Sequence, residues 1–215
     1  MKEIKVYYSE LDSDFSDERF RNLVSNLPLF LQNKINRLRR KTSQLNSLVG
    51  LELLKYALKE NGFSDDKIED IEYNTNGKPF IQNAFYFNLS HSNNIIVLAC
   101  YNSEIGIDIE QIREVDSTKL SAFLSEKEIH EIRQSNKPNL LFADIWTKKE
   151  AFVKAIGKGI AKTPFAKIQI SENTISYLDK KYFCTKISIQ NNMSSHFCVE
   201  QKNIPFTIDQ VSVLI

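Results

Sequence analysis

The segment EIGIDIEQI, residues 104–112, places two acidic side chains inside an apolar run. Its isoleucines alternate with Gly106, Asp108 and Glu110, which is the period of a β-strand with one buried face. Both carboxylates then lie on the same face, about 7 Å apart at the rise of two strand residues. Because like charges at this spacing repel, the pair needs a nearby cation or a proton. The alternative is that both acids belong to the solvated face of an edge strand.

The segment LLFADIWTKKEAFVKAIGKGI, residues 140–160, carries a second acidic site on a predicted helix. Glu150 and Lys154 lie one turn apart at the edge of its apolar stripe, and taken alone they could be an exposed i,i+4 pair. Lys149 falls near the middle of the stripe, so we expect a structural ion pair with an acid there. The apolar stripe consists of Phe142, Ile145, Trp146, Phe152, Val153 and Ile156.

Three further segments hold side chains that could contact a phosphate. KINRLRRK, residues 34–41, has five basic side chains in eight positions, a pattern that is also typical of a solvated helix face. Lys78 and Pro79 follow a turn glycine, and Ser90 and His91 follow the end of an apolar strand. Ser90 and His91 could also be a hydrogen-bonded loop pair. A Ser-His hydrolase is disfavoured, because the GxSxG motif is absent, and a P-loop is absent too.

The composition excludes several classes of protein. The chain has 215 residues, of which 42% are hydrophobic and 26% charged, and its net charge is +1. These values are ordinary for a globular protein and indicate neither a nucleic-acid nor a membrane partner. Three cysteines without CxxC spacing argue against a disulfide framework and against a zinc site. Because no signal peptide or long apolar run is present, we expect a cytoplasmic protein.

The predicted elements repeat in the same order. A strand at 3–8 precedes helices that end near Asn26 and Asn61, followed by strands at 71–73, 85–89 and 95–100. A strand at 105–110 precedes helices near 117–134 and 139–157, followed by strands at 167–171, 175–178, 182–189, 196–200 and 211–215. We therefore predict an α+β protein with two similar subdomains, residues 1–102 and 103–215, and a ligand cleft between them.

Several of these segments resemble the motifs of a known family. IGIDIE, followed further along by WTKKEAFVKAIGKG, is similar to the signature pair of the 4′-phosphopantetheinyl transferase superfamily. Upstream, GKP and NLSHS match additional motifs of its two-subdomain type, which activates surfactin synthetase and similar assembly lines. The resemblance implies two α+β subdomains related by a pseudo-two-fold axis, and a monomer whose active site lies between them.

The resemblance also implies a reaction. Enzymes of this family transfer the phosphopantetheine arm of coenzyme A to a serine of an apo acyl or peptidyl carrier protein and release adenosine 3′,5′-bisphosphate. Asp108, Glu110 and Glu150 would then ligate Mg²⁺, although Mn²⁺ accepts the same oxygen ligands. Lys154 would hold the pyrophosphate and protonate the leaving phosphate. Glu150, or Glu128 acting through water, would take the proton of the serine.

The remaining candidate residues concern coenzyme A. By the same resemblance, its adenosine 3′-phosphate and adenine end would be held by Lys78, Pro79, Ser90 and His91. Many relatives carry a basic residue near position 46, where this chain has Asn46. Lys34, Arg37 and Lys41 could supply that charge instead.

Other interpretations remain open on the residues alone. SEKE, from Ser125 to Glu128, also fits a capping box, in which Glu128 binds the backbone N–H of Ser125. The same acids could serve a metal-dependent hydrolase of a nucleotide pyrophosphate, with water as the nucleophile. A third possibility is a non-catalytic binding module that shares the fold.

Overall fold

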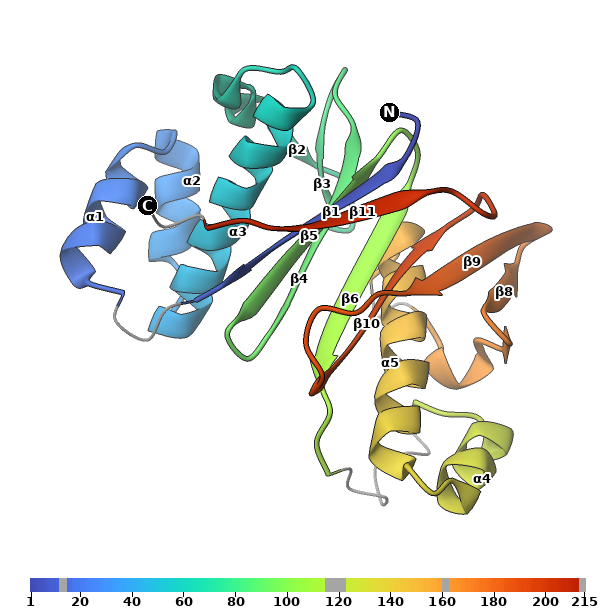
Figure 1. Cartoon of the computed structure of the whole chain (residues 1–215). Coiled ribbons are helices and arrows are strands. Elements are labelled where there is room, and N and C mark those ends of the chain that lie inside the picture. Colours follow the sequence, from blue (N-terminus) through green and yellow to red (C-terminus); the bar gives the residue numbers. More distant parts are fainter. Residues whose placement is uncertain (12–14, 115–122, 160–162, 213–215) are drawn as a thin grey trace.

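The computed structural model describes residues 1–11, 15–114, 123–159 and 163–212 (Figure 1). Two β-sheets pack face to face in the middle of the molecule, and each sheet carries one long helix on its outer face. These helices are α3 (Lys41–Glu60) and α5 (Pro138–Ala155). The predicted α+β class is confirmed. None of the helices in the described ranges is long and apolar enough to cross a membrane.

The first sheet has the strand order β11-β1-β5-β4. Its antiparallel strands are β1 (Ile4–Glu10), β5 (Ile95–Tyr101) and β4 (Tyr86–Ser92), and β11 (Phe206–Gln210) pairs parallel with β1. Beside α3 lie α1 (Asp17–Ser25) and α2 (Leu29–Asn36). A 3₁₀ helix, η1 (Asp65–Asp70), and the hairpin of β2 (Ile71–Tyr73) and β3 (Pro79–Ile81) follow α3 along the chain.

The second sheet has the strand order β6-β10-β9-β8-β7 and is antiparallel throughout. Its strands are β6 (Ile105–Gln111), β10 (Met193–Val199), β9 (Lys180–Lys186), β8 (Thr174–Tyr177) and β7 (Ile170–Ser171). Helix α5 covers its outer face, and α4 (Glu126–Gln134) packs beside α5. A short 3₁₀ helix, η4 (Phe165–Lys167), lies between α5 and β7 in the sequence.

Strand β5 explains why the molecule has four layers. Its residues Ile95 and Val97 pack between the sheets, against Ile105 and Ile107 of β6. The alternate residues, such as Leu98, pack in the cluster beneath α3. Since both faces of β5 are buried, its sequence is a continuous apolar run rather than an alternating one. The layers are therefore α3, the first sheet, the second sheet and α5.

The last strand differs from its predicted position at 211–215. In the structure β11 begins directly after Pro205, whose carbonyl oxygen accepts a hydrogen bond from Ile4 N. The backbone N–H of Val211 still donates to Tyr8 at 2.8 Å, and residues 213–215 lie outside the described part of the chain. β11 therefore belongs to the first sheet, although its residues come from the second half of the chain. The division at residue 103 stays a prediction.

Candidate active site

Strand β6 carries its two acids on the face that looks toward α5. Ile105, Ile107 and Ile109 are fully buried between the sheets, as the alternation predicted. Asp108 is only 2% exposed, and Glu110 is half-buried. The acids therefore do not belong to a solvated face of an edge strand.

Gly106 allows α5 to lie directly on β6. A Cβ atom at this position would lie 2.0 Å from the backbone oxygen of Ala151 and 2.4 Å from the backbone nitrogen of Ala155. Only a residue without a side chain permits this approach. The close packing brings the α5 residues Glu150 and Lys154 next to Asp108.

The ammonium group of Lys154 lies between acids from the strand and from the helix. Its Nζ atom is 2.6 Å from Asp108 Oδ1 and 3.7 Å from Glu150 Oε2. It also donates a hydrogen bond of 2.9 Å to Ser90 Oγ. Glu150 is 8% exposed, so Glu150 and Lys154 are not an isolated surface pair.

The crowding of negative charge changes the acidity of two carboxyl groups. Burial raises the pKa of Glu150 to about 7, the charge of Asp108 adds to this effect, and Lys154 opposes it. Burial and the Asp108 charge also raise the pKa of Glu110, and the hydrogen bond from Ser92 opposes this rise. A bound cation would stabilise the ionised form of both groups.

The oxygen atoms at this site fit a hard cation. Asp108 Oδ2 is buried and has no hydrogen-bond partner among the described residues, although an ionised oxygen needs one. Within the described ranges, no three histidine, cysteine, aspartate or glutamate side chains are already arranged to hold a metal ion. Mg²⁺ does not require such a cage, because it binds through a few carboxylates and completes its shell with water and substrate phosphate. Asp108, Glu110 and Glu150 are the residues that could hold it.

A cavity of about 440 Å³ opens beside the acids, between α3, β4 and the β2–β3 hairpin. Four of the residues predicted to hold coenzyme A line it: Lys34, Pro79, Ser90 and His91. Ser90 lines the cavity and donates a hydrogen bond of 2.8 Å to Asp108 Oδ1. Ser90 therefore connects the cavity wall to the Asp108 carboxylate.

Two hydrogen bonds hold polar residues of the cavity wall. The side-chain amide of Asn46 donates to His91 Nδ1 at 3.2 Å. The ammonium of Lys34 donates to the hydroxyl of Tyr73 at 2.6 Å and lies over its ring. Burial and the nearby charge of Lys154 lower the pKa of His91, so the imidazole is neutral at pH 7.

Comparisons with known proteins agree with the predicted family. The model of the 4′-phosphopantetheinyl transferase superfamily matches residues 104–207, which include both signature segments. The 4′-phosphopantetheinyl transferase Sfp of Bacillus subtilis (strain 168) is 28% identical over 74% of this chain and 72% of its own. The holo-[acyl-carrier-protein] synthase (AcpS) of Thermotoga maritima aligns with 46% of this chain and 64% of its own. Its TM-score is 0.36 and its identity 18%, so this structure adds nothing to the fold assignment.

The decisive relative is the 4′-phosphopantetheinyl transferase gsp of Aneurinibacillus migulanus. It is 31% identical over 160 residues, which span 73% of this chain and 67% of its own. The chain belongs to the 4′-phosphopantetheinyl transferase superfamily. The predicted family and enzyme class are thereby confirmed, and coenzyme A is the substrate that the superfamily uses.

Three of the basic residues predicted to bind coenzyme A, Arg37, Lys41 and Lys78, are not among the residues that line this cavity. The ammonium of Lys78 contacts Glu104 and donates to the carbonyl oxygens of Ile105 and Ala155, each at 3.1 Å. It thus links the turn before β3 to β6 and to the end of α5. A role for Lys78 at coenzyme A stays a prediction.

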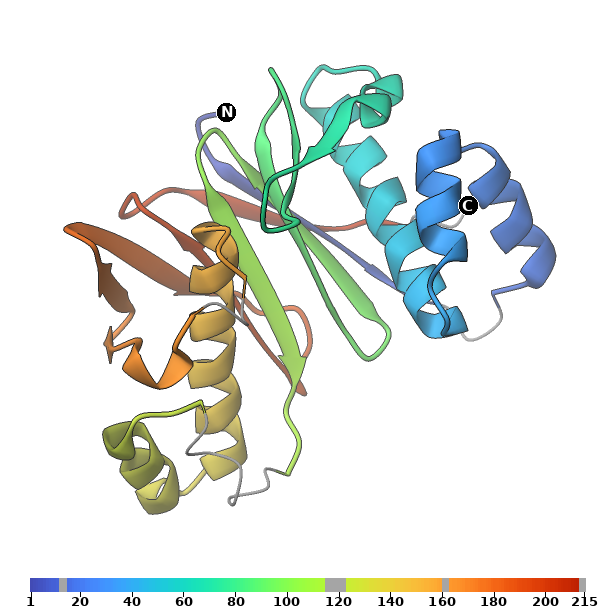
Figure 2. The same cartoon turned by 180° about the vertical axis from the view of Figure 1, so that it is seen from behind.

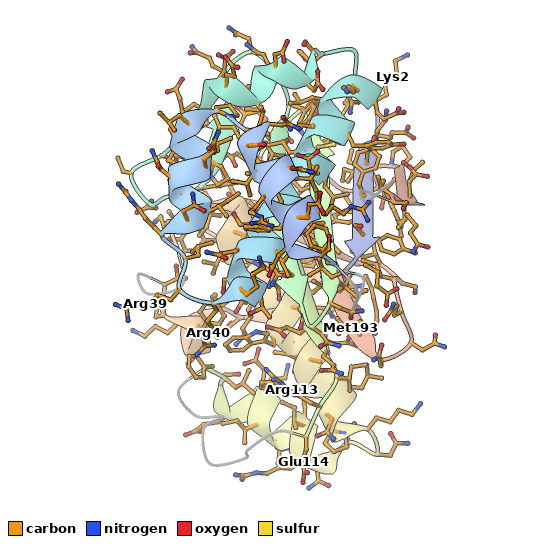
Figure 3. All side chains as sticks on the ribbon, turned by 90° about the vertical axis from the view of Figure 1, so that its left-hand side faces the viewer. Lys2, Arg39, Arg40, Arg113, Glu114 and Met193 are labelled. Atoms are coloured by element: carbon orange, nitrogen blue, oxygen red, sulfur yellow. The ribbon has the colours of Figure 1, made fainter. Side chains whose placement is uncertain are left out.

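Lys41 forms an ion pair of 2.7 Å with Asp17 on α1 and does not line the cavity. Arg37 caps the end of α2, is exposed, and does not line the cavity either. The neighbouring Arg39 and Arg40, labelled in Figure 3, extend at the surface between α2 and α3, above Arg113 and Glu114. Roles for Arg37 and Lys41 at coenzyme A stay predictions.

Glu128 has two structural partners in the transferase. Its Oε2 atom accepts a hydrogen bond from the backbone N–H of Ser125 at 2.8 Å, which completes the predicted capping box. The same oxygen lies 2.6 Å from the fully buried ammonium of Lys149, so the predicted structural ion pair is confirmed. A catalytic role for Glu128 stays a prediction.

Sequence reasoning missed three residues that shape this site. Gly106 permits the helix packing, and Asn88 and Ser92 of β4 form hydrogen bonds to β6. The alternation of polar side chains in NLSHS, at every second position from Asn88, is a signal that could have indicated a second contact surface.

Proposed function

We propose that this transferase moves the 4′-phosphopantetheine arm of coenzyme A to a serine of an apo carrier protein in a Mg²⁺-dependent reaction. The observation that carries the proposal is the position of Lys154, whose ammonium contacts Asp108 and Glu150 and donates a hydrogen bond to Ser90 of the cavity wall. In this reaction the serine hydroxyl attacks the phosphorus that bears the pantetheine arm. The bond to adenosine 3′,5′-bisphosphate breaks, and the proton of the serine passes to a base.

The proposed metal ligands are Asp108, Glu110 and Glu150. When bound, Mg²⁺ would neutralise the charge of the pyrophosphate oxygens and align them for displacement. The unpartnered Oδ2 atom of Asp108 and the raised pKa values of the two glutamates support this assignment.

Lys154 is the proposed acid for the leaving group. Its ammonium lies at the boundary between the carboxylates and the cavity, where it can contact a pyrophosphate and donate a proton to the departing oxygen. Ser90 lies between Asp108 and the cavity, where it would hold the adenosine 3′-phosphate end of coenzyme A.

Glu150 is the better placed of the two proposed bases. Its carboxylate lies at the proposed reaction site, 3.7 Å from the Lys154 ammonium. Glu128, by contrast, is bound to Lys149 and to the start of α4. The adenosine end of coenzyme A would lie in the cavity, near Lys34, Pro79 and His91.

We also propose that the transferase acts as a cytoplasmic monomer. Three buried, free cysteines are compatible with a reducing compartment. The lining residues of the cavity and the proposed metal ligands all come from one chain. Size-exclusion chromatography with light scattering at assay concentration tests the monomer, and a dimer mass contradicts it.

The test uses coenzyme A, Mg²⁺ and a panel of purified apo acyl and peptidyl carrier proteins, with mass spectrometry as the readout. We expect the added arm on at least one carrier, and loss of transfer after chelation of Mg²⁺ and in Asp108→Ala. The panel also identifies the preferred carrier. No transfer to any carrier, with Asp108→Ala equal to the wild type, would contradict the proposal. Cleavage of coenzyme A without an acceptor would favour a pyrophosphate hydrolase instead.

A further inference from the structure

The two sheets meet along a line that no strand pairing crosses. β4 is an edge strand of the first sheet, β6 is an edge strand of the second, and they run side by side (Figure 2). An edge strand leaves backbone amides that need hydrogen-bond partners when they are buried. Here the partners are side chains of β4.

Two side chains of β4 replace a backbone ladder. Asn88 Oδ1 accepts a hydrogen bond of 2.9 Å from the backbone N–H of Ile107, in a buried environment. Ser92 Oγ accepts one of 3.1 Å from the backbone N–H of Gln111. Asn88 and Ser92 therefore fix the register of β6 against β4 at both ends of the contact.

The same row of side chains reaches the acids. Ser90 Oγ donates to Asp108 Oδ1 at 2.8 Å, and Ser92 Oγ donates to Glu110 Oε2 at 3.0 Å. The two serines are two residues apart in β4, and the two acids are two residues apart in β6. Side chains on one face of a strand recur at this spacing, so each serine lies opposite one acid. A shift of β6 by one residue would turn both acids away from their serines.

Ser92 differs from Ser90 in its surroundings. Ser90 lines the cavity and contacts Lys154, whereas Ser92 does not line it. The hydroxyl of Ser92 has one donor bond, to Glu110, and one acceptor bond, from the Gln111 backbone. It is therefore occupied on both sides by β6 and is not available to a substrate.

We propose that Ser92 is a positioning residue, whose hydroxyl orients the Glu110 carboxylate as a metal ligand by binding it to the Gln111 backbone and to β4. This inference rests on the proposed function, because it assigns Glu110 to the ion. Residues that orient a metal ligand by hydrogen bonding commonly change metal affinity when they are replaced.

The test titrates Mn²⁺ into the complex of the full chain with coenzyme A and follows bound Mn²⁺ by electron paramagnetic resonance. In Ser92→Ala we expect the Kd for Mn²⁺ to rise about 10-fold. The affinity for coenzyme A, measured without metal, should not change. Ser92→Thr keeps a hydroxyl and should restore most of the Mn²⁺ affinity. Ser195→Ala is the matched control, because Ser195 is a buried serine of the second sheet whose hydroxyl has no partner.

Wild-type Mn²⁺ affinity in Ser92→Ala would overturn the inference, and so would an equal weakening in Ser195→Ala. If Ser92→Ala does not fold, Ser92→Cys gives the same comparison, because a thiol is a weak donor of similar size. Weakened Mn²⁺ binding in Ser92→Cys would support the inference, and unchanged binding would overturn it. Failure of the proposed function looks different, since the wild-type chain would then transfer no arm to any carrier, whatever its affinity for Mn²⁺.

Discussion

Helix α5 carries two lysines that each contact a carboxylate at 2.6 Å, yet the two pairs have different surroundings. Lys149 contacts Glu128, and Lys154 contacts Asp108. The Lys149 side chain is fully buried, whereas that of Lys154 is 24% exposed beside the cavity. One pair is therefore sealed in the interior and the other is accessible to a ligand.

The two pairs also differ in the groups that surround them. Lys149 also donates to the carbonyl oxygens of Phe123 and Phe165, at 3.3 and 3.0 Å, so its three donors are all used. Among the described residues both carboxylates keep one buried oxygen without a hydrogen-bond partner, Oε1 of Glu128 and Oδ2 of Asp108, but Asp108 also lies close to Glu110 and Glu150. The sealed pair, whose lysine has no free donor, holds elements together, whereas the accessible pair, with further acids beside it, can take up a cation.

Replacement of Lys154 by methionine should have the largest effect. We expect kcat for transfer to fall by about 10²–10⁴-fold, because the leaving phosphate loses its proton donor. Lys158→Met is the control, since Lys158 lies just beyond the same helix and donates a hydrogen bond to the Tyr177 hydroxyl at the surface. Steady-state kinetics with saturating coenzyme A measures the effect. If kcat in Lys154→Met equals that of the wild type, Lys154 is not the proton donor, and its ion pair does not differ in role from that of Lys149.

Lys149→Met should act mainly on stability. It leaves Glu128 buried without its counter-charge, so we expect the free energy of unfolding to fall by about 3–5 kcal/mol. Transfer should also slow, because α4 and α5 lose a connection. Urea denaturation measures the loss, and the double variant Lys149→Met/Glu128→Gln should recover part of it. An unchanged melting temperature would count against a structural pair.

The raised pKa of Glu150 predicts that the stability of the folded chain depends on pH. This pKa, about 7 in the folded chain, exceeds the ordinary value of 4.5. Between these values the folded chain binds more protons than the unfolded chain. The stability contributed by protonated Glu150 is therefore full below pH 4.5 and is lost as pH rises to about 7.

Urea titrations from pH 4.5 to 7, in the presence of a chelator, test this behaviour. Glu150→Gln should flatten the fall in stability across this range, because the amide does not titrate. If the variant and the wild type lose stability with the same slope, the raised pKa does not belong to Glu150.

Lys34→Ala should have the smallest effect. Lys34 is exposed on the cavity wall, where a contact with an anion contributes up to about 1 kcal/mol, or roughly a five-fold change in affinity. We expect a comparable rise in the KM for coenzyme A with little change in kcat. Lys41→Ala, whose ion pair with Asp17 lies outside the cavity, should leave this KM unchanged. An equal rise in KM in Lys34→Ala and Lys41→Ala would show that the position of Lys34 on the cavity wall does not matter for coenzyme A binding.

Local sequence patterns were sufficient for the elements that carry the acids. Alternation in residues 105–111 predicted the strand and its two faces, because the side-chain period is a property of the strand itself. The helical stripe predicted a buried Lys149, and the cost of burying a charge predicted an acidic partner. Both arguments need only neighbouring residues.

Other parts of the site depend on residues distant in the sequence. Lys78 follows a turn and looked available for a phosphate, but its ammonium reaches the carbonyl oxygen of Ala155 at the end of α5. The role of Ser92 depends on β6 lying beside β4, and the need for Gly106 depends on the approach of α5. No local pattern encodes these approaches, because they arise when the layers pack.

The proposed chemistry requires a single divalent ion that contacts both Asp108 and Glu150. Mn²⁺ binding to the complex of the chain with coenzyme A tests this requirement directly. The wild-type chain should bind one Mn²⁺ with an electron paramagnetic resonance signal distinct from that of the free ion. Asp108→Asn and Glu150→Gln should each abolish this binding while the chain remains folded. Wild-type Mn²⁺ affinity in either variant would show that strand and helix do not share an ion.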